Sequence, residues 1–197
     1  MAFIQTVPAE QATDKLQELY NDDLHSLGYI ANHTQAMSLR PEVNAAWRNL
    51  IGTIRSKMRL RRYELVTIAA AAALRCTYCL LAHGAVLRKN FFTAEQVVAI
   101  LRDYRQAGLE PEEVAMMALA EKVTLEAQSV TPQDIENLRG YGLTDAEILD
   151  VILAAAARNF FSKVLDAIGA EPDAVYLELD PQLREALVKG RAFEAMS

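Results

Sequence analysis

The sequence predicts an all-α fold, and three observations lead to this expectation. Apolar residues recur at helical spacing along most of the chain. Helix start and stop signals alternate, with prolines or capping boxes before the apolar stretches and glycines after them. No stretch alternates β-branched and polar residues as a half-buried strand would. We therefore expect residues 1–197 to form a single domain, a compact multi-helix bundle.

Four helices are expected in the N-terminal half, the first two opened by prolines. Pro8 and Pro41 suit the first turn of a helix, and Gly28 lies in the break between these two helices. The third helix is almost entirely apolar after Glu64, so we expect it to be buried. The four are expected at about residues 7–27, 41–57, 60–74 and 76–89.

Five further helices are expected in the C-terminal half. Thr93 with Gln96 and Thr144 with Glu147 form capping boxes, in which side chains satisfy free backbone N–H groups. Prolines open the other three helices, and glycines end several of the five. These helices are expected at about residues 93–108, 110–128, 131–140, 144–168 and 181–195.

A weak internal repeat relates the segment that begins at Leu60 to the segment that begins at Leu143. Each copy has a glutamate four residues after this leucine, then a run of alanines, then an arginine. Repetition of this kind suggests two related helical units around a pseudo-twofold axis. The second copy, near residues 143–169, lacks the cysteines and the histidine of the first, so we expect it to serve packing only. The residues in their places are Asn159, Ser162 and Asp166.

Composition excludes several classes of function. The net charge of −6 and the absence of a basic cluster argue against a nucleic-acid partner. No segment has the apolar length of a membrane span, and the N-terminus does not resemble a secretory signal, so we expect a cytoplasmic protein with no membrane partner. In a reducing compartment, a lone Cys-x-x-Cys pair indicates catalysis or metal binding rather than a structural disulfide.

Both cysteines of the protein lie in one motif, Glu64–x11–Cys76–x2–Cys79–x3–His83. On a helix, residues three and four positions apart share a face. Cys76 and Cys79 are expected in a first helical turn, where the helix dipole favours a thiolate. His83 follows Cys79 by four positions and can accept its proton directly or through a water. The pattern favours a redox dithiol in which Cys79 is the nucleophile and Cys76 the resolving partner.

The role of Glu64 is less direct. In one straight helix it would lie about 18 Å from Cys76 at ~1.5 Å per residue. The helix could break near Arg75 and fold back, Glu64 could serve a site in another subunit, or it could only stabilise the start of its own helix. Because a fold-back still leaves Glu64 a helix length from the cysteines, we favour the subunit route if Glu64 is functional.

Simpler interpretations of the same residues also exist. Cys76 and Cys79 could be two small buried hydrophobic residues. A zinc site would need a fourth ligand, His25 or His33, from far along the chain, so we expect no metal. His25 and His33 receive no role. Aromatic residues are expected to pack in the core or at subunit contacts. These are Tyr78, Trp47 and the phenylalanine pairs at 91–92 and 160–161.

Glu64, Cys76, Cys79 and His83, together with the sequence LLAHGAVLRKN, resemble the motif of the alkylhydroperoxidase D-like branch of the carboxymuconolactone decarboxylase superfamily. The stretch NFFSKVLDAIGAEPD, residues 159–173, is similar to the subgroup of peroxidase-related enzymes. The resemblance implies an all-α fold, a homo-oligomer such as a trimer or hexamer, and thiol peroxidase activity with no bound cofactor. It further implies that Cys79 attacks the hydroperoxide, that Cys76 forms the disulfide, and that Glu64 and His83 belong to a proton relay.

The resemblance also implies that an external dithiol, of the lipoyl or thioredoxin type, restores the reduced pair. One position departs from the pattern. Alkylhydroperoxidase D has an additional histidine directly before the second cysteine, where this chain has Tyr78. A tyrosine is a poor base near neutrality, so the relay is altered and Tyr78 serves either the relay or packing. The alternative hypothesis is a redox-sensing or helical assembly module whose dithiol is oxidised without turnover.

Overall fold

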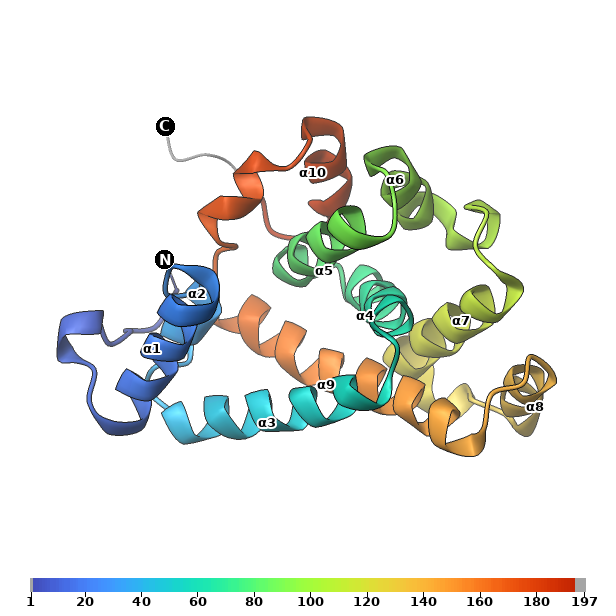
Figure 1. Cartoon of the computed structure of the whole chain (residues 1–197), viewed down its shortest axis with the longest axis horizontal. Helices are drawn as coiled ribbons and strands as arrows, with labels where there is room; N and C mark the ends of the chain where they lie inside the picture. Colours follow the sequence, from blue (N-terminus) through green and yellow to red (C-terminus); the bar gives the residue numbers. More distant parts are fainter. Residues whose placement is uncertain (1, 194–197) are drawn as a thin grey trace.

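The structure, a computed structural model, describes residues 2–193 as helices joined by short connections, with no strand in this range (Figure 1). The all-α prediction is confirmed. The α-helices are α1 (Asp14–Leu27), α2 (Asn32–Ala36), α3 (Pro41–Lys57), α4 (Leu60–Leu74), α5 (Thr77–Asn90), α6 (Ala94–Asp103), α7 (Pro111–Glu126), α8 (Pro132–Gly140), α9 (Asp145–Ile168) and α10 (Pro181–Leu187). Short 3₁₀ helices lie at Ala9–Gln11, Tyr104–Gln106, Ala127–Ser129 and Ala174–Glu178.

Helix α4 forms the centre of the molecule. Every residue from Tyr63 to Ala71 is buried, as its apolar sequence predicts. It packs against α5, α7 and α9, and Figure 1 shows these helices around it. A small-residue surface of alanines lets these neighbours approach closely. The elements that carry the motif are therefore held in the best-packed part of the protein.

A tight turn reverses the chain between α4 and α5. Arg75 adopts a left-handed conformation, with φ of 57°, and ends α4. The backbone N–H groups of Arg75 and Cys76 donate to carbonyls of the last turn of α4, and α5 then begins at Thr77. Because α5 packs back along α4, residues late in α5 approach residues early in α4.

The first predicted helix begins later than expected. Pro8 precedes a short 3₁₀ turn, and α1 starts only at Asp14. Tertiary hydrogen bonds explain the delay, because Val7 donates its N–H to Ser38 Oγ at 2.8 Å and accepts from the Tyr20 hydroxyl at 2.5 Å. Leu16 and Leu19 of α1 are buried, whereas Leu24 is about half exposed.

The last predicted helix ends earlier than expected, at Leu187 rather than near Ala195. Beyond it, the chain crosses the turn between α4 and α5. The backbone carbonyl of Lys189 accepts two hydrogen bonds from the Arg75 guanidinium, and Gly190 donates its N–H to Thr77 Oγ1 at 3.0 Å. These contacts compete with helix continuation. Residues 194–197, which include the predicted helix end, lie outside the described residues.

The remaining boundaries follow the predicted signals. The capping boxes at Thr93 and Thr144 both form, and α9 ends at Gly169, which has a left-handed φ of 67°. The expected helix at 93–108 divides into α6 and a 3₁₀ turn. No helix within residues 2–193 has both the length and the apolar character needed to cross a bilayer.

Candidate active site

The two cysteines lie at the N-terminus of α5. Cys76 is the residue that caps this helix, and Cys79 lies in its first turn. Both are free thiols and almost completely buried. The free N–H groups of a first helical turn favour negative charge. This position therefore suits a thiolate, as the sequence predicts.

Helix α9 supplies the polar partners of Cys79. The Ser162 hydroxyl donates to Cys79 Sγ at 3.2 Å, and the Arg158 guanidinium lies at 3.5 Å from the same atom. The Cys76 thiol contacts the backbone carbonyl of Ser162 at 3.9 Å. Arg158 and Ser162 are both buried, so these interactions act in a medium that screens charge weakly. The sulfur of Cys79 thus faces a cation and a hydroxyl donor.

The two thiols have opposite pKa shifts. A hydrogen bond from the Cys76 side chain, with the Arg158 guanidinium and the Ser162 hydroxyl, holds the pKa of Cys79 well below the ordinary thiol value although burial opposes this. The same bond to Cys79, together with burial, raises the pKa of Cys76. The reduced site is therefore a thiolate at Cys79 beside a thiol at Cys76, as a nucleophile with a resolving partner requires.

Glu64 and His83 meet within one chain. Glu64 Oε2 lies 2.6 Å from His83 Nδ1, and the carboxylate is almost completely buried. The subunit route favoured from the sequence is therefore not needed to bring Glu64 to His83. The turn at Arg75 sends α5 back along α4, so that Glu64 meets the histidine, seven residues beyond Cys76, rather than the cysteines. The carboxylate accepts a hydrogen bond from Nδ1, so Nε2 is the ring nitrogen that Glu64 does not contact.

The second copy of the repeat does more than pack. Ser162, which takes the place of Cys79 in the repeat, donates to the Cys79 sulfur. Asp166, which takes the place of His83, lies close enough to Cys76 to influence the pKa of that thiol. The expectation that the second copy serves packing only is wrong, because side chains without redox chemistry of their own still act on the two thiols of the first copy. Helices α4 and α9 pack side by side, which brings the second copy to the dithiol.

A signal for Arg158 was present in the sequence. It is the only charged residue between Asp150 and Lys163, in a stretch that is otherwise apolar or neutral. A charged side chain in a buried helix needs a partner. Ser162 follows it by four positions and therefore shares its face. The spacing alone could not identify a cysteine of another helix as the shared partner.

A cavity of about 470 Å³ connects the candidate site to the surface. Its walls come from α2, α3, α4, α5, α9 and the 3₁₀ helix at Ala174–Glu178. Cys79, Glu64 and His83 line it, so the predicted nucleophile and relay share one space. Aromatic and basic side chains complete the wall. They are His33, Trp47, Arg48, Arg55, Tyr63, Tyr78, Arg158, Phe161 and Tyr176. Trp47 and Phe161, predicted as core or contact residues, stack with ring centroids 4.7 Å apart.

No hydrogen bond within residues 2–193 joins His83 to Cys79, whose partners come from α5 and α9. His83 nevertheless acts on the thiol, because its charge contributes to lowering the pKa of Cys79. A bound water or substrate in the cavity can bridge the two side chains. Of the two routes that the spacing allowed, direct or through a water, the described structure has no hydrogen bond for the direct one.

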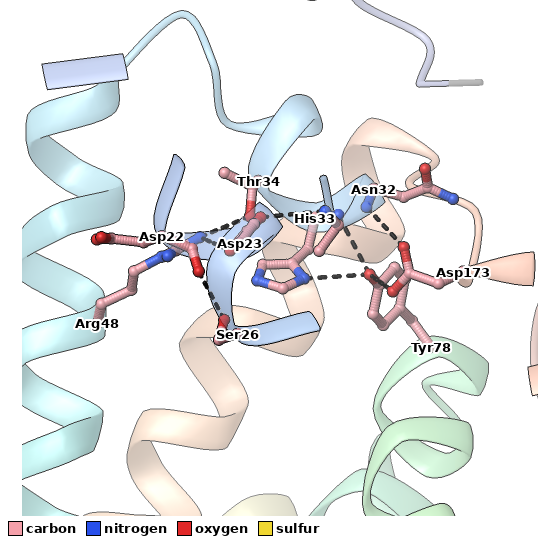
Figure 2. Close-up of polar contacts among 10 residues, drawn as sticks. Asp22, Asp23, Ser26, Asn32, His33, Thr34, Arg48, Tyr78 and Asp173 are labelled. Carbon is pink, nitrogen blue, oxygen red and sulfur yellow. Dashed lines mark hydrogen bonds and ion pairs between the residues drawn. The ribbon is translucent and has the colours of Figure 1, made fainter. Parts of the chain in front are cut away.

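Tyr78 and His33 form a second polar group in the cavity wall (Figure 2). The buried Tyr78 hydroxyl donates to Asp173 Oδ2 at 2.6 Å and lies 3.1 Å from His33 Nδ1. Sequence reasoning gave His33 no role, because its contact with Tyr78 depends on the tertiary fold. His25, by contrast, is exposed on α1. In the described part of the chain, no group of three or more His, Cys, Asp or Glu side chains is arranged to hold a metal ion.

The fold and the site define a class, all-helical proteins that hold a thiolate–thiol pair at a helix N-terminus beside a Glu–His pair. Residues 41–122, from the start of α3 into α7, match the model of the carboxymuconolactone decarboxylase family. This match covers the part of the chain that carries the Glu64, Cys76, Cys79 and His83 motif, and it agrees with the family resemblance that the motif predicts. Among curated proteins, none matches the chain.

Solved structures share the fold across nearly the whole chain. An uncharacterized peroxidase-related protein from Ralstonia eutropha JMP134, described as an alkylhydroperoxidase AhpD core, is 23% identical, with a TM-score of 0.82 over 89% of this chain and 94% of that one. A peroxidase-related protein from Silicibacter sp. TM1040 is 23% identical, with a TM-score of 0.81 over 90% and 94%. The debrominase Bmp8, in complex with 2,3,4-tribromopyrrole, is 13% identical, with a TM-score of 0.75 over 93% and 96%.

Proposed function

We propose that the protein is a cysteine-based peroxidase that reduces hydroperoxides through a dithiol–disulfide cycle. The observation that carries the proposal is the pairing of Cys79, which has a lowered pKa and lines a cavity, with Cys76, which has a raised pKa and lies buried behind it. A thiolate is the attacking species, and a neighbouring thiol is what a sulfenic acid needs for resolution. The match to the carboxymuconolactone decarboxylase family model and the likeness to peroxidase-related proteins support a peroxidase-related function, although a debrominase shares the same fold.

In the first step, the Cys79 thiolate attacks the terminal oxygen of the hydroperoxide. A sulfur–oxygen bond forms and the oxygen–oxygen bond breaks. The sulfur is oxidised by two electrons to a sulfenic acid, which keeps the terminal oxygen and its proton. The peroxide is reduced to an alkoxide, which takes a proton from the His83 side of the cavity. Arg158, at 3.5 Å from the sulfur, stabilises the negative charge that moves from sulfur to oxygen.

In the second step, the Cys76 sulfur attacks the Cys79 sulfenic acid. The disulfide bond forms, the sulfur–oxygen bond breaks, and the hydroxide leaves as water with the Cys76 proton. Two electrons from an external dithiol, of the lipoyl or thioredoxin type, then reduce the disulfide. Glu64 holds His83 through Nδ1 at 2.6 Å and is a positioning residue in this scheme, because it acts through the imidazole.

The test is a titration of the reduced protein with one equivalent of cumene hydroperoxide. Both free thiols should disappear and one equivalent of the alcohol should form. Cys79→Ser should abolish peroxide consumption, whereas Cys76→Ser should consume one equivalent and stop at a sulfenic acid that dimedone traps. Survival of both thiols in the wild-type protein would contradict the proposal.

A second candidate, a redox-sensing or assembly module of the same fold, is favoured by the nearly complete burial of both cysteines. It predicts a single slow oxidation and no steady-state consumption with dihydrolipoamide or reduced thioredoxin. Sustained turnover with either reductant supports the peroxidase, and its absence with both supports the module.

A further inference from the structure

A chain of three side chains leads from Asp173 through Tyr78 to His33 (Figure 2). Tyr78 directly precedes the nucleophile Cys79, and its ring lies edge-on to the His33 ring, with centroids 5.8 Å apart. The Tyr78 hydroxyl lies 2.6 Å from Asp173 Oδ2 and 3.1 Å from His33 Nδ1. It also accepts the backbone N–H of His33 at 3.2 Å. This chain makes no contact with the Glu64–His83 pair and has no part in the scheme above.

The hydrogen-bond donors among Asp173, Tyr78 and His33 determine which nitrogen of His33 carries the proton. Tyr78 has one hydroxyl hydrogen, and the short contact assigns it to the carboxylate of Asp173. Asp173 accepts a second bond at Oδ1 from the Asn32 backbone N–H at 2.7 Å, so both carboxyl oxygens accept. Burial raises the pKa of Asp173, and the hydrogen bonds from Asn32 and Tyr78 oppose this shift and favour the ionised form. The Tyr78 oxygen can then only accept from His33. The proton of the imidazole therefore lies on Nδ1, and Nε2 carries a lone pair.

The imidazole is also neutral. Burial, together with the charges of Arg48 and Arg158, lowers the pKa of His33 to about 4 against the opposing effect of Asp23. These are the charged groups that face the ring from α1, α3 and α9, and Asp173 faces it through Tyr78. A single tautomer thus persists through the neutral range.

The free nitrogen belongs to the cavity that holds Cys79. His33 lines this cavity, and Figure 2 shows one ring nitrogen directed to Tyr78 and the other on the opposite side of the ring. Within residues 2–193, Nε2 has no hydrogen-bond partner. The ring packs edge-on against Phe161, with centroids 5.6 Å apart, which restricts its rotation. His33 therefore offers a fixed acceptor to whatever enters.

The surrounding loops fix this position. Asp23 accepts the backbone N–H of Ala31 at 3.0 Å and the Arg48 guanidinium at 2.7 Å, and Arg48 also donates to Thr34 Oγ1 at 2.7 Å. The Asn32 side chain donates to backbone carbonyls of residues 171 and 172. These bonds tie the start of α2 to α1, α3 and the segment after α9. Such support is what holds a binding group in one geometry.

The other groups that line the cavity indicate what His33 Nε2 can bind there. The cavity that Cys79 lines holds the cations Arg158 and Arg48, and the carboxylate of Glu64 is already bonded to His83. A hydroperoxide carries one O–H hydrogen that needs an acceptor when it leaves water. A carboxylate in that place would repel the Cys79 thiolate, whereas a neutral imidazole nitrogen does not.

We propose that His33 binds the hydroperoxide, with Nε2 accepting a hydrogen bond from its O–H group and thereby orienting the terminal oxygen toward Cys79. The proposal rests on the peroxidase function above. Tyr78 and Asp173 are positioning residues that fix the tautomer. The cavity thus holds two imidazoles, each tied through Nδ1, one on the O–H side of the peroxide and one on the side of the leaving oxygen.

The variant that isolates this contact is His33→Asn. The amide nitrogen of asparagine can take the place of Nδ1 and still donate to Tyr78, whereas no atom takes the place of Nε2. The second-order rate of Cys79 oxidation by cumene hydroperoxide should fall about tenfold, the value of one hydrogen bond, with an unchanged thermal midpoint. The rate of alkylation of Cys79 by iodoacetamide, which needs no such acceptor, should stay within about twofold of the wild-type rate. His25→Asn on the exposed face of α1 is the matched control and should change neither rate. An unchanged peroxide rate in His33→Asn, or equal losses in both reactions, would overturn the proposal.

A second measurement needs no peroxide. Nitrogen-15 NMR of the imidazoles should find Nε2 of His33 unprotonated at neutral pH, and Tyr78→Phe should shift the population toward the other tautomer. A proton on Nε2 in the wild-type protein would overturn the proposal. If the wild-type thiols do not react with peroxide, the proposed function fails while the NMR result still decides whether the acceptor is present, so the two failures are distinguishable.

Discussion

Arg158 is the residue on which the reactivity of Cys79 most depends outside the motif. Replacement by Met keeps much of its volume and removes the buried cation beside the sulfur. Loss of an adjacent opposite charge should raise the pKa of Cys79 by about one to three pH units. The thiolate absorbance followed against pH should report this shift, and the rate with hydroperoxide at neutral pH should fall accordingly.

Ser162→Ala gives the graded comparison. It removes one donor at 3.2 Å and no charge, so the pKa of Cys79 should rise by less than in Arg158→Met. Arg102→Met, on an exposed position of α6, is the matched control and should leave the titration unchanged. An equal titration curve in wild-type protein and Arg158→Met would mean that the guanidinium does not stabilise the thiolate.

At the residue scale, sequence spacing could identify only the groups that share a local helix. Cys76, Cys79 and His83 lie within two turns, so their pattern is visible. Arg158 and His33 reach the same cavity from α9 and α2, which only tertiary packing brings to α5. Glu64 was recognised as a candidate, but its partner depended on the left-handed turn at Arg75.

At the scale of elements, local signals determine helix boundaries where nothing else competes. Pro41–Lys57 and Leu60–Leu74 match their predicted limits because a proline and an apolar run mark them. The start of α1 and the end of α10 were wrong, since hydrogen bonds at Val7 and Lys189 to distant segments override helix propensity there. Tertiary contacts of this kind leave no periodic trace in a sequence.

The packing of α10 on α5 depends on the absence of a side chain at Gly84. A Cβ there would lie 2.5 Å from Leu187 Cδ2, and Leu187 is completely buried. Gly84→Ala should therefore displace α10 and lower the free energy of unfolding by about 1 to 3 kcal/mol, despite the better helix propensity of alanine. Urea unfolding measures this change.

Gly52 in α3 is the matched control. An added Cβ would meet no atom within 4 Å there, so only helix propensity changes. Gly52→Ala should raise the free energy of unfolding by up to about 1 kcal/mol. A stabilisation of similar size in Gly84→Ala would show that Leu187 moves aside freely and that α10 is loosely held.

At the scale of the whole molecule, two neighbouring helices expose apolar side chains. Leu149, Leu153 and Phe160 are exposed along α9, and Leu50 is exposed on α3, which packs against α9. The ring contact between Trp47 and Phe160, at 5.5 Å, joins the two helices. Exposed apolar patches of this kind mark interaction surfaces. This surface is the one we expect to carry the predicted homo-oligomer.

Leu149→Glu with Leu153→Glu should therefore shift the protein toward monomers in sedimentation velocity experiments, because burial of two carboxylates in an interface is unfavourable. Leu125→Glu changes an even more exposed leucine on α7 and should leave the assembly intact. A wild-type protein that sediments as a monomer would contradict the prediction of a trimer or hexamer.

Finally, the dithiol should make the stability of the reduced protein depend on pH. The pKa of Cys79 is lowered in the folded state, so its contribution is complete above the unfolded-state pKa of about 9 and is lost as pH falls through the folded-state value. Between these two pKa values the unfolded chain binds one more proton than the folded one. The free energy of unfolding should then rise by about 1.4 kcal/mol per pH unit relative to Cys79→Ser.

Above pH of about 9, the raised pKa of Cys76 reverses the sign of this pH dependence, because the unfolded chain now loses a proton that the folded protein keeps. Urea unfolding of both proteins with a non-thiol reductant measures the difference. A flat difference across this window would mean that Cys79 is protonated in the folded protein, which would remove the nucleophile from the mechanism.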